Sequence, residues 1–445
     1  MNNNDFMKTK PVLPLILSMS MPMVISMLVN SLYNIVDSYF VAKISENAMT
    51  SLSLVFPVQN FINSIAVGFG VGINAVISYF LGAKKKEQAD NAASIGMLFS
   101  ILHGILMIFI CNLIMPSFLG MFTSDKEVIE LGLKYSRIVF SFSIFICVSL
   151  TFEKVFQAVG KMTFTMISLM SGCIVNIILD PVLIFGLGPV KSLGINGAAI
   201  ATVIGQLTTF LIYVFIYLRK DAGIKFNLRN ISFDISIIKK LYAVGIPATL
   251  NMALPSVLTS ALNAILSSFS GMYVVILGIY YKLQTFLYLP ANGLIQGMRP
   301  IIGYNYGAGE KIRVKKIYHT TLALNSIIMI FGTIICLIIP GQLMGLFSTS
   351  PKTIHAGKTA LRIICLGFII STISVTASGA LEGLGMGLKS LVISLLRYVI
   401  IIIPSAFILS SFAGVYGVWN SFWIAEVITA SFSYIMVRRM FKRMP

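Results

Sequence analysis

The sequence predicts an all-α membrane protein with twelve transmembrane helices, arranged as two six-helix lobes that are related by an axis along the membrane normal. Three observations support this prediction. Of the 445 residues, 57% are hydrophobic and only 11% are charged, whereas soluble domains contain about 25% charged residues. Long apolar runs recur along the whole chain, and the second half repeats features of the first. This composition excludes a soluble enzyme, a fibrous protein and a disordered chain.

Twelve apolar runs are long enough to cross a bilayer, because a spanning helix needs about 20 mainly apolar residues. The first run is too long for the core of a signal peptide and is interpreted as the first span. The five cysteines lie inside apolar runs without metal-ligand spacing, which indicates free, buried thiols. The predicted spans are residues 14–38, 50–79, 93–115, 131–152, 162–185, 194–218, 241–267, 273–300, 318–340, 359–381, 388–409 and 416–437.

Basic residues fall mainly on one side of this topology. The net charge of +18 would suggest nucleic-acid binding in a soluble protein, but here Lys and Arg cluster between apolar runs, as they do in cytoplasmic loops. One side carries 22 of them, at residues 8–10, 84–86, 154–161, 219–240, 311–316, 389 and 438–443. The other side carries six, which are Lys43, Lys126, Lys134, Lys191, Lys352 and Lys358. This bias places both termini in the cytoplasm, in agreement with an even number of spans.

The chain repeats itself at one constant offset, which is the spacing from Pro22 to Pro247. Apolar helices resemble one another in Leu and Ile, but chance does not bring Gly, Pro and Arg into one register at several separate places. Because each half has an even number of spans, both halves enter the membrane with the same orientation. Parallel repeats of this kind occur in secondary transporters, which bind their substrate between the halves. The matching pairs are Pro22 and Pro247, Gly72 and Gly297, Tyr79 and Tyr304, Gly82 and Gly307, Phe122 and Phe347, Arg137 and Arg362, and Gly160 and Gly385.

One stretch, residues 221–240, is polar and basic and makes the only sizeable break in hydrophobicity. It is interpreted as a cytoplasmic linker. The predicted domains are therefore an N-terminal lobe at residues 1–220, which includes the cytoplasmic N-terminus, and a C-terminal lobe at residues 241–445.

Two carboxylic acids inside the N-terminal half suggest an ion-coupling site. A charged side chain in hydrocarbon is costly, so each one needs a reason. The topology places Asp37 near the outer end of the first span and Asp180 in the outer third of the fifth. Two neighbouring carboxyl groups raise each other's proton affinity. The alternative is that Asp37 lies at the lipid interface and Asp180 caps a loop.

Polar residues on the same spans support a shared face. Tyr33 or Asn34 falls on one helical stripe with Asp37, and Asn176 precedes Asp180 by four residues. Thr202 and Gln206, also four residues apart, lie in the outer half of the sixth span, at a similar predicted depth.

Other polar residues in the spans allow two interpretations. Glu153 and Gln157, beside Lys154 at the cytoplasmic end of the fourth span, suit either an interfacial ion pair or a functional acid. Lys282 in the eighth span and Glu426 in the twelfth either pair with each other or line a cavity.

Two more polar residues lie inside single spans. Arg397 in the eleventh span lines the cavity or extends to the interface, and His103 in the third is expected to bond a neighbouring helix. The sequence contains no phosphate loop, zinc-binding spacing or nucleophile elbow. It therefore predicts neither an enzyme nor a cofactor or structural metal.

Several segments resemble the MATE (multidrug and toxic compound extrusion) transporters, in particular the bacterial drug-efflux branch. They are NIILDPVLIFG at residues 176–186, GINGAAIAT at 194–202, FEKVFQAVGKM at 152–162, the LGAK run at 81–84 and the early helix with Tyr33 and Asp37. The resemblance covers nearly the whole chain. It implies two six-helix lobes around a V-shaped cleft, with export coupled to the inward flow of protons or sodium ions.

The resemblance also implies roles for particular residues. Asp37, Asn176, Asp180 and Thr202 would form the cation site, which suits either H+ or Na+. Glu153 resembles an acid of the drug-efflux branch. Another branch carries acids in the seventh and tenth helices of its C-terminal lobe. This sequence departs from that branch, because its seventh span has no acid and Leu262 occupies the position that matches Asp37.

The predicted function is secondary active antiport in the cell membrane, in which small lipophilic or cationic drug-like compounds leave in exchange for H+ or Na+ by alternating access. The chain is expected to act as a monomer in the bilayer without binding nucleic acid. The alternative is a flippase for a lipid-linked precursor. Such a protein carries a strongly basic central cavity, for which this chain offers only Lys282 and Arg397.

Overall fold

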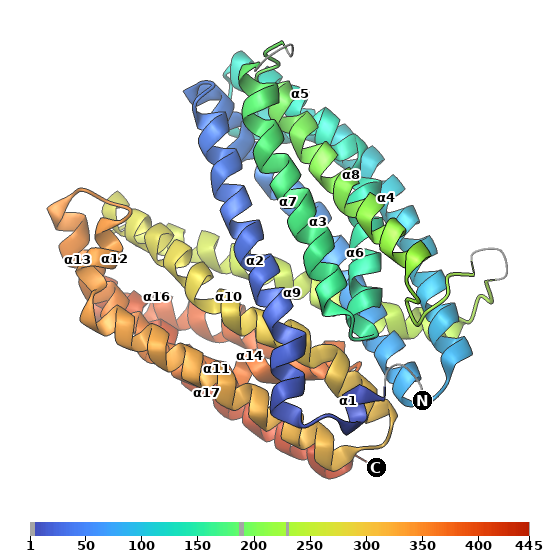
Figure 1. Cartoon of the computed structure of the whole chain (residues 1–445). Coiled ribbons are helices and arrows are strands. Elements are labelled where there is room, and N and C mark those ends of the chain that lie inside the picture. The colour runs from blue at the N-terminus through green and yellow to red at the C-terminus, as the bar shows by residue number, and fades with distance from the viewer. Residues whose placement is uncertain (1–4, 187–190, 228–230, 445) are drawn as a thin grey trace. The chain divides into compact units, whose positions relative to one another are not determined.

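The computed structural model describes residues 5–186, 191–227 and 231–444, and every regular element in these ranges is helical (Figure 1). The predicted all-α class is confirmed. Cys365–Gly367 forms a 3-10 turn and Leu396–Ile401 a π-helical turn. The α-helices are α1 (Phe6–Thr9), α2 (Val12–Ala42), α3 (Glu46–Gly82), α4 (Lys86–Phe122), α5 (Lys126–Ser141), α6 (Ser143–Ala158), α7 (Met162–Phe185), α8 (Ile195–Arg219), α9 (Ile235–Ser267), α10 (Gly271–Gly307), α11 (Lys311–Ile338), α12 (Pro340–Gly345), α13 (Pro351–Ile364), α14 (Phe368–Gly383), α15 (Gly387–Leu395), α16 (Ile402–Ala413) and α17 (Val415–Arg443).

The number of membrane-spanning helices follows from length and apolar character. In the described ranges, ten helical stretches meet both criteria, or eleven when α5 and α6, which meet at a bend of 46°, count as one span. These eleven coincide with the first eleven predicted spans. The twelfth, α17, has 29 residues and is long enough, but its polar residues, Glu426 among them, make it less apolar than the others.

The chain forms two compact units. The first contains Met21–Thr249 and the N-terminal end up to Phe6, and the second contains Met7–Ser20 and Leu250–Pro445. Each unit has its own apolar core. Tyr135 and Phe140 are buried in the core of the first, and Trp419 is buried in that of the second. The helices α2 and α9, which begin the two repeats, each contribute residues to both units.

The predicted linker belongs to the first unit, so the units divide at Thr249 rather than at residues 221–240. Hydrogen bonds to α4 explain this assignment. The Lys225 N–H donates to Asp90 at 2.9 Å, and the Asn227 N–H donates to Ser94 at 2.9 Å. Near the start of the linker, the Gly223 N–H donates to the exposed Asp221 carboxylate and lowers its pKa. Residues 228–230, which include Arg229, lie outside the described residues.

Backbone conformation supports the internal repeat. Gly160 and Gly385, which match in sequence, have φ angles of 79° and 77°, in the left-handed region that glycine adopts most easily. Gly194 and Gly414, which directly precede α8 and α17, have φ angles of 56° and 57°. Gly194 and Gly414 are slightly fewer residues apart in the sequence than Gly160 and Gly385 are. The offset between the repeats therefore shortens before the last helix of each half.

Candidate ion-coupling site

Asp37 and Asp180 come together inside the first unit. Asp37 lies on α2 with 7% of its surface exposed, and Asp180 lies on α7 with 0%. The two carboxyl groups are close enough to interact electrostatically. One oxygen of Asp37 and both oxygens of Asp180 are buried without a hydrogen-bond partner in the described part of the chain. Two such carboxylates repel each other when both are ionised, so a proton or a cation between them stabilises the site.

The alternative interpretation of Asp180 as a loop cap is not compatible with this geometry. Asp180 lies inside α7, which continues to Phe185, and Gly186 caps the helix in a left-handed conformation. Pro181 follows within the same helix and lacks an N–H, so the helix hydrogen bond that would end at the Ile177 carbonyl is missing. The acid is therefore held by the helix interior and not by the loop.

Three neutral polar side chains share this part of the unit. Asn176 and Thr202 are each 2% exposed. Both polar atoms of Asn176, the Thr202 hydroxyl and the Gln206 carbonyl oxygen are buried without partners in the described residues. Buried polar groups are normally hydrogen-bonded. So many unsatisfied oxygen atoms beside two acids indicate a site for a small polar ligand, a cation or water.

Close helix packing brings these residues together. Gly172 on α7 and Gly205 on α8 let the two helices approach closely, as small residues do in membranes. A Cβ atom on Gly205 would lie 2.9 Å from the Gly172 carbonyl oxygen and 3.1 Å from the Asn176 Cβ. Asn176 therefore faces α8 between the turns that carry Thr202 and Gln206.

Two residues of this site, Tyr135 and Gln59, were not predicted from the sequence. Tyr135 on α5, 1% exposed, interacts electrostatically with both acids. It lies beside Gln59 on α3 and Thr202 on α8, although the Thr202 hydroxyl falls short of hydrogen-bond geometry. Tyr33 on α2, which was predicted, interacts with the same two acids.

Asn34 belongs elsewhere. Its amide group is exposed and donates to the Asn30 backbone and side-chain oxygens, at 2.8 and 2.9 Å. Of the two candidates for the helical stripe with Asp37, Tyr33 is the one that interacts electrostatically with the acids.

Glu153 forms a separate buried cluster in the first unit. Lys154 donates to Glu153 at 2.7 Å and to Gln157 at 3.2 Å, and Gln157 donates to Glu153 at 2.8 Å. The three side chains are between 2% and 5% exposed. The ion-pair interpretation is therefore correct, but the pair is buried rather than interfacial, and Lys154 does not belong with the loop charges. The predicted contact of His103 is also confirmed, since its Nε2 lies 2.9 Å from the Tyr242 hydroxyl on α9.

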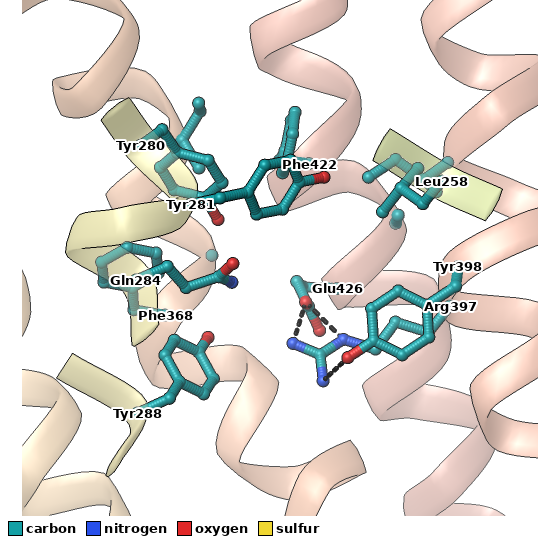
Figure 2. A pocket seen from close by; sticks show the side chains of 14 residues that line it. Leu258, Tyr280, Tyr281, Gln284, Tyr288, Phe368, Arg397, Tyr398, Phe422 and Glu426 are labelled. Carbon is teal, nitrogen blue, oxygen red and sulfur yellow. Dashed lines mark hydrogen bonds and ion pairs between the residues drawn. The ribbon is translucent and has the colours of Figure 1, made fainter. Parts of the chain in front are cut away.

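In the second unit, Glu426 pairs with Arg397 and not with Lys282. The Arg397 Nη2 and Nε lie 2.6 and 2.7 Å from one Glu426 oxygen, and Figure 2 shows both side chains in one pocket. Lys282 is exposed and lies 5.6 Å from the centre of the Phe347 ring. Of the two interpretations of Lys282 and Glu426, their pairing with each other is therefore wrong, whereas Glu426 does line a cavity.

A family model named MatE matches residues 22–182 and 247–408. The chain belongs to the MatE family. The resemblance to MATE transporters is thereby confirmed, and the two matched segments begin at Pro22 and Pro247, the first matching pair of the internal repeat.

Relatives and solved structures agree with this assignment over nearly the full length. The multidrug export protein MepA of Staphylococcus haemolyticus is 27% identical over 96% of this chain and 93% of its own. MepA of Staphylococcus aureus strain MRSA252 is 26% identical over 97% and 95%. An outward-facing MATE transporter of the MOP superfamily has a TM-score of 0.93 at 24% identity, covering 100% and 99%. A MATE structure in a bent conformation has a TM-score of 0.94 at 24% identity, covering 100% and 98%. These structures show the fold.

Proposed function

We propose that this protein is a secondary active antiporter of the cell membrane, with both termini in the cytoplasm. It exports small lipophilic or cationic compounds, and H+ or Na+ flows inward in exchange. The names of the staphylococcal relatives, both multidrug export proteins, support the class of substrate. Acting as a monomer, the protein alternates between inward- and outward-facing states.

The observation that carries the proposal is the pair of buried acids without basic partners. Asp37 and Asp180 interact with each other, and neither forms an ion pair in the described part of the chain. Asn176 and Thr202 add oxygen atoms that lack protein partners. Two carboxylates with neutral oxygens suit a proton or a hard monovalent cation, and the ion exchanges because no side chain permanently neutralises the acids.

Coupling requires that the ion bind one conformational state better than the other, since equal binding would shift nothing. Here the bound ion lies between two acids on different helices, α2 and α7, and one positive charge reduces the repulsion between them. When the site is empty, repulsion between the carboxylates favours separation of these helices or access to water. When it is occupied, the helices pack together. Alternating between the two arrangements links ion movement to substrate export.

The flippase alternative has weaker support. A pyrophosphate headgroup needs several free cationic groups. Arg397 is already neutralised by Glu426, and Lys282 lies on an exposed face beside Phe347.

The test is transport of a fluorescent cation into everted vesicles under separately imposed proton and sodium gradients. Wild-type protein should respond to at least one gradient. Asp180→Asn keeps the shape but removes the charge. It should lose at least about 90% of gradient-driven transport, because losing about 1.4 kcal/mol of interaction with the ion already weakens its binding tenfold.

Glu87→Gln serves as the matched control, because Glu87 is exposed on the first turn of α4. It should transport as the wild type does. Retained gradient dependence in folded Asp180→Asn would remove this acid from the mechanism, and no response of the wild type to either gradient would contradict antiport.

A further inference from the structure

The second unit contains a small aromatic pocket around one ion pair. Tyr280, Tyr281, Tyr288 and Tyr398 surround Arg397 and Glu426 (Figure 2). The cavity has a volume of about 30 Å³, enough for one or two water molecules. The Tyr281 hydroxyl is buried without a good hydrogen bond to the described residues, and the Tyr288 hydroxyl is bonded to Ser371 at 2.7 Å.

This pocket overlaps the position in the second half that the acid site occupies in the first, although Leu262 and Ser405, which match Asp37 and Asp180, are not among its lining residues. Gly194, which precedes α8, matches Gly414, which precedes α17, because both have a positive φ angle. Gly197 in α8 matches Gly417 in α17, because both pack closely against a neighbouring backbone. In the register that these glycines define, Thr202 matches Phe422, and Gln206 matches Glu426. Phe422 and Glu426 both line the pocket.

The helices α2 and α3 give further matches, at the offset that relates Pro22 to Pro247. Tyr33 corresponds to Leu258, and Gln59 corresponds to Gln284. Leu258 and Gln284 line the pocket. In the first half, Tyr33 interacts electrostatically with the two acids, and so does Tyr135, which lies beside Gln59. Four positions that line the pocket in the second unit therefore match residues at or beside the acid site in the first unit.

The chemistry of the two sites differs at the matching positions. Arg397 matches Gly172, and Leu262 stands where the first half has Asp37. Arg397 lies in the π-helical turn Leu396–Ile401, whereas the matching α7 is α-helical throughout. The extra residue of a π-turn changes which side chains face inward. It accompanies the insertion of a guanidinium group into the pocket.

Both charges of the Arg397–Glu426 ion pair belong to the chain, so neither can dissociate as a bound ion does. Arg397 donates twice to one Glu426 oxygen, and Ser374 lies 3.5 Å from the other. A guanidinium group keeps its charge in proteins, and its own side chain holds it beside the acid. The pair therefore has its positive charge supplied by the chain itself and needs no dissolved cation.

We propose that Arg397 is a built-in cation: its guanidinium group fills, in the C-terminal half, the counterpart of the site where the N-terminal half exchanges an ion. The second half then stays permanently in its cation-bound form, and one site per chain exchanges ions. The statement about exchange rests on the proposed function. The statement that the Glu426 pocket is a guanidinium site does not.

Chemical rescue tests this assignment. Arg397→Ala leaves Glu426 unpaired in its pocket, with room for a free guanidinium ion. In the Asp180→Asn background, which silences the first site, millimolar guanidinium should raise the melting temperature of purified Arg397→Ala saturably, on the order of 2 °C. Protein that retains Arg397 should show no such rise.

Three controls make the result specific. Tetramethylammonium, a cation without N–H donors, should not stabilise Arg397→Ala. The double variant Arg397→Ala with Glu426→Gln should not respond to guanidinium. Lys282→Ala removes a positive charge from the same unit without exposing an acid, and should also not respond. Absence of the rise in folded Arg397→Ala, or an equal rise in the double variant, would overturn the assignment.

A second measurement applies if Arg397→Ala does not fold. The double variant removes both charges together, which proteins tolerate better than the loss of one. Its efflux should keep the ion-gradient dependence of the wild type. Loss of that dependence in a folded double variant would mean that the pair exchanges ions and would overturn the proposal. A wild type without gradient dependence would instead contradict the proposed antiport.

Discussion

The acids in the interior of the two units differ in what neutralises them. Glu153 pairs with Lys154, Glu382 with Arg299, and Glu426 with Arg397. Asp37 and Asp180 form no ion pair in the described part of the chain and contact only neutral groups and each other. Inside a membrane, an acid with a basic partner is a structural element, whereas an acid without one needs a ligand. This contrast separates the candidate coupling site from the remaining polar residues.

The contrast predicts that Glu153→Gln acts on stability. The substitution leaves the Lys154 ammonium group buried at 3% exposure without its carboxylate. Breaking a buried pair by removing one partner costs about 3–5 kcal/mol. The melting temperature of the purified variant should therefore fall, with efflux per folded molecule little changed.

The double variant Glu153→Gln with Lys154→Met is the control, because it removes both charges and keeps a similar volume. It should recover most of the lost stability. If Glu153→Gln melts like the wild type but loses gradient-driven efflux, Glu153 belongs to the coupling machinery instead.

At the scale of helices, the α7–α8 contact determines the geometry of the coupling site. We predict that Gly205→Ala destabilises the protein by about 1–3 kcal/mol, the usual cost of overpacking. The new Cβ would lie 2.9 Å from the Gly172 carbonyl oxygen, so the helices must separate and Asn176 must move away from Thr202. Both the melting temperature and the ion dependence of efflux should decrease.

Gly120→Ala is the matched control, since Gly120 also lies in a helix, α4, but has no atom within 4 Å of an added Cβ. Alanine has a higher helix propensity than glycine by about 1 kcal/mol, so this variant should be neutral or slightly more stable. Equal effects of the two substitutions would show that the α7–α8 contact does not govern the site.

The same helix contacts explain what the sequence could and could not predict. Hydropathy and charge bias suffice to find the spans, because the bilayer imposes a length and a side on each one. The common depth of Asp37 and Asp180 followed from that topology. Tyr135 and Gln59 were missed, because their role depends on which faces of α5 and α3 point toward the acids. Local sequence patterns do not predict this orientation. The wrong partner for Glu426 has the same cause, together with the π-turn that carries Arg397.

At the scale of the whole chain, the duplicated sequence carries two different sites. The repeats match in backbone conformation, as Gly160 and Gly385 show. The first has two acids without bases, and the second has one acid with its own base. Duplication thus supplies a common scaffold, on which substitutions at corresponding positions leave one half with two unpaired acids and the other with an ion pair.

The whole-chain topology gives the last prediction, which concerns α17. Ten or eleven helical stretches in the described ranges are apolar enough to span, and an odd number would leave the termini on opposite sides. The basic cluster Arg438 to Arg443 instead predicts that α17 crosses the membrane and ends in the cytoplasm. Its Glu426 does not oppose crossing, because Arg397 neutralises it.

Cysteine labelling decides the question with little background, since all five native cysteines are buried. A membrane-impermeant maleimide should label Ser411→Cys, at the exposed end of α16, in intact cells. It should label Lys442→Cys, exposed at the end of α17, only after the cells are permeabilised. Lys126→Cys and Lys220→Cys calibrate the outer and inner sides. If Lys442→Cys reacts in intact cells as readily as Ser411→Cys, then α17 does not cross the membrane, and the cytoplasmic position of its C-terminal end is wrong.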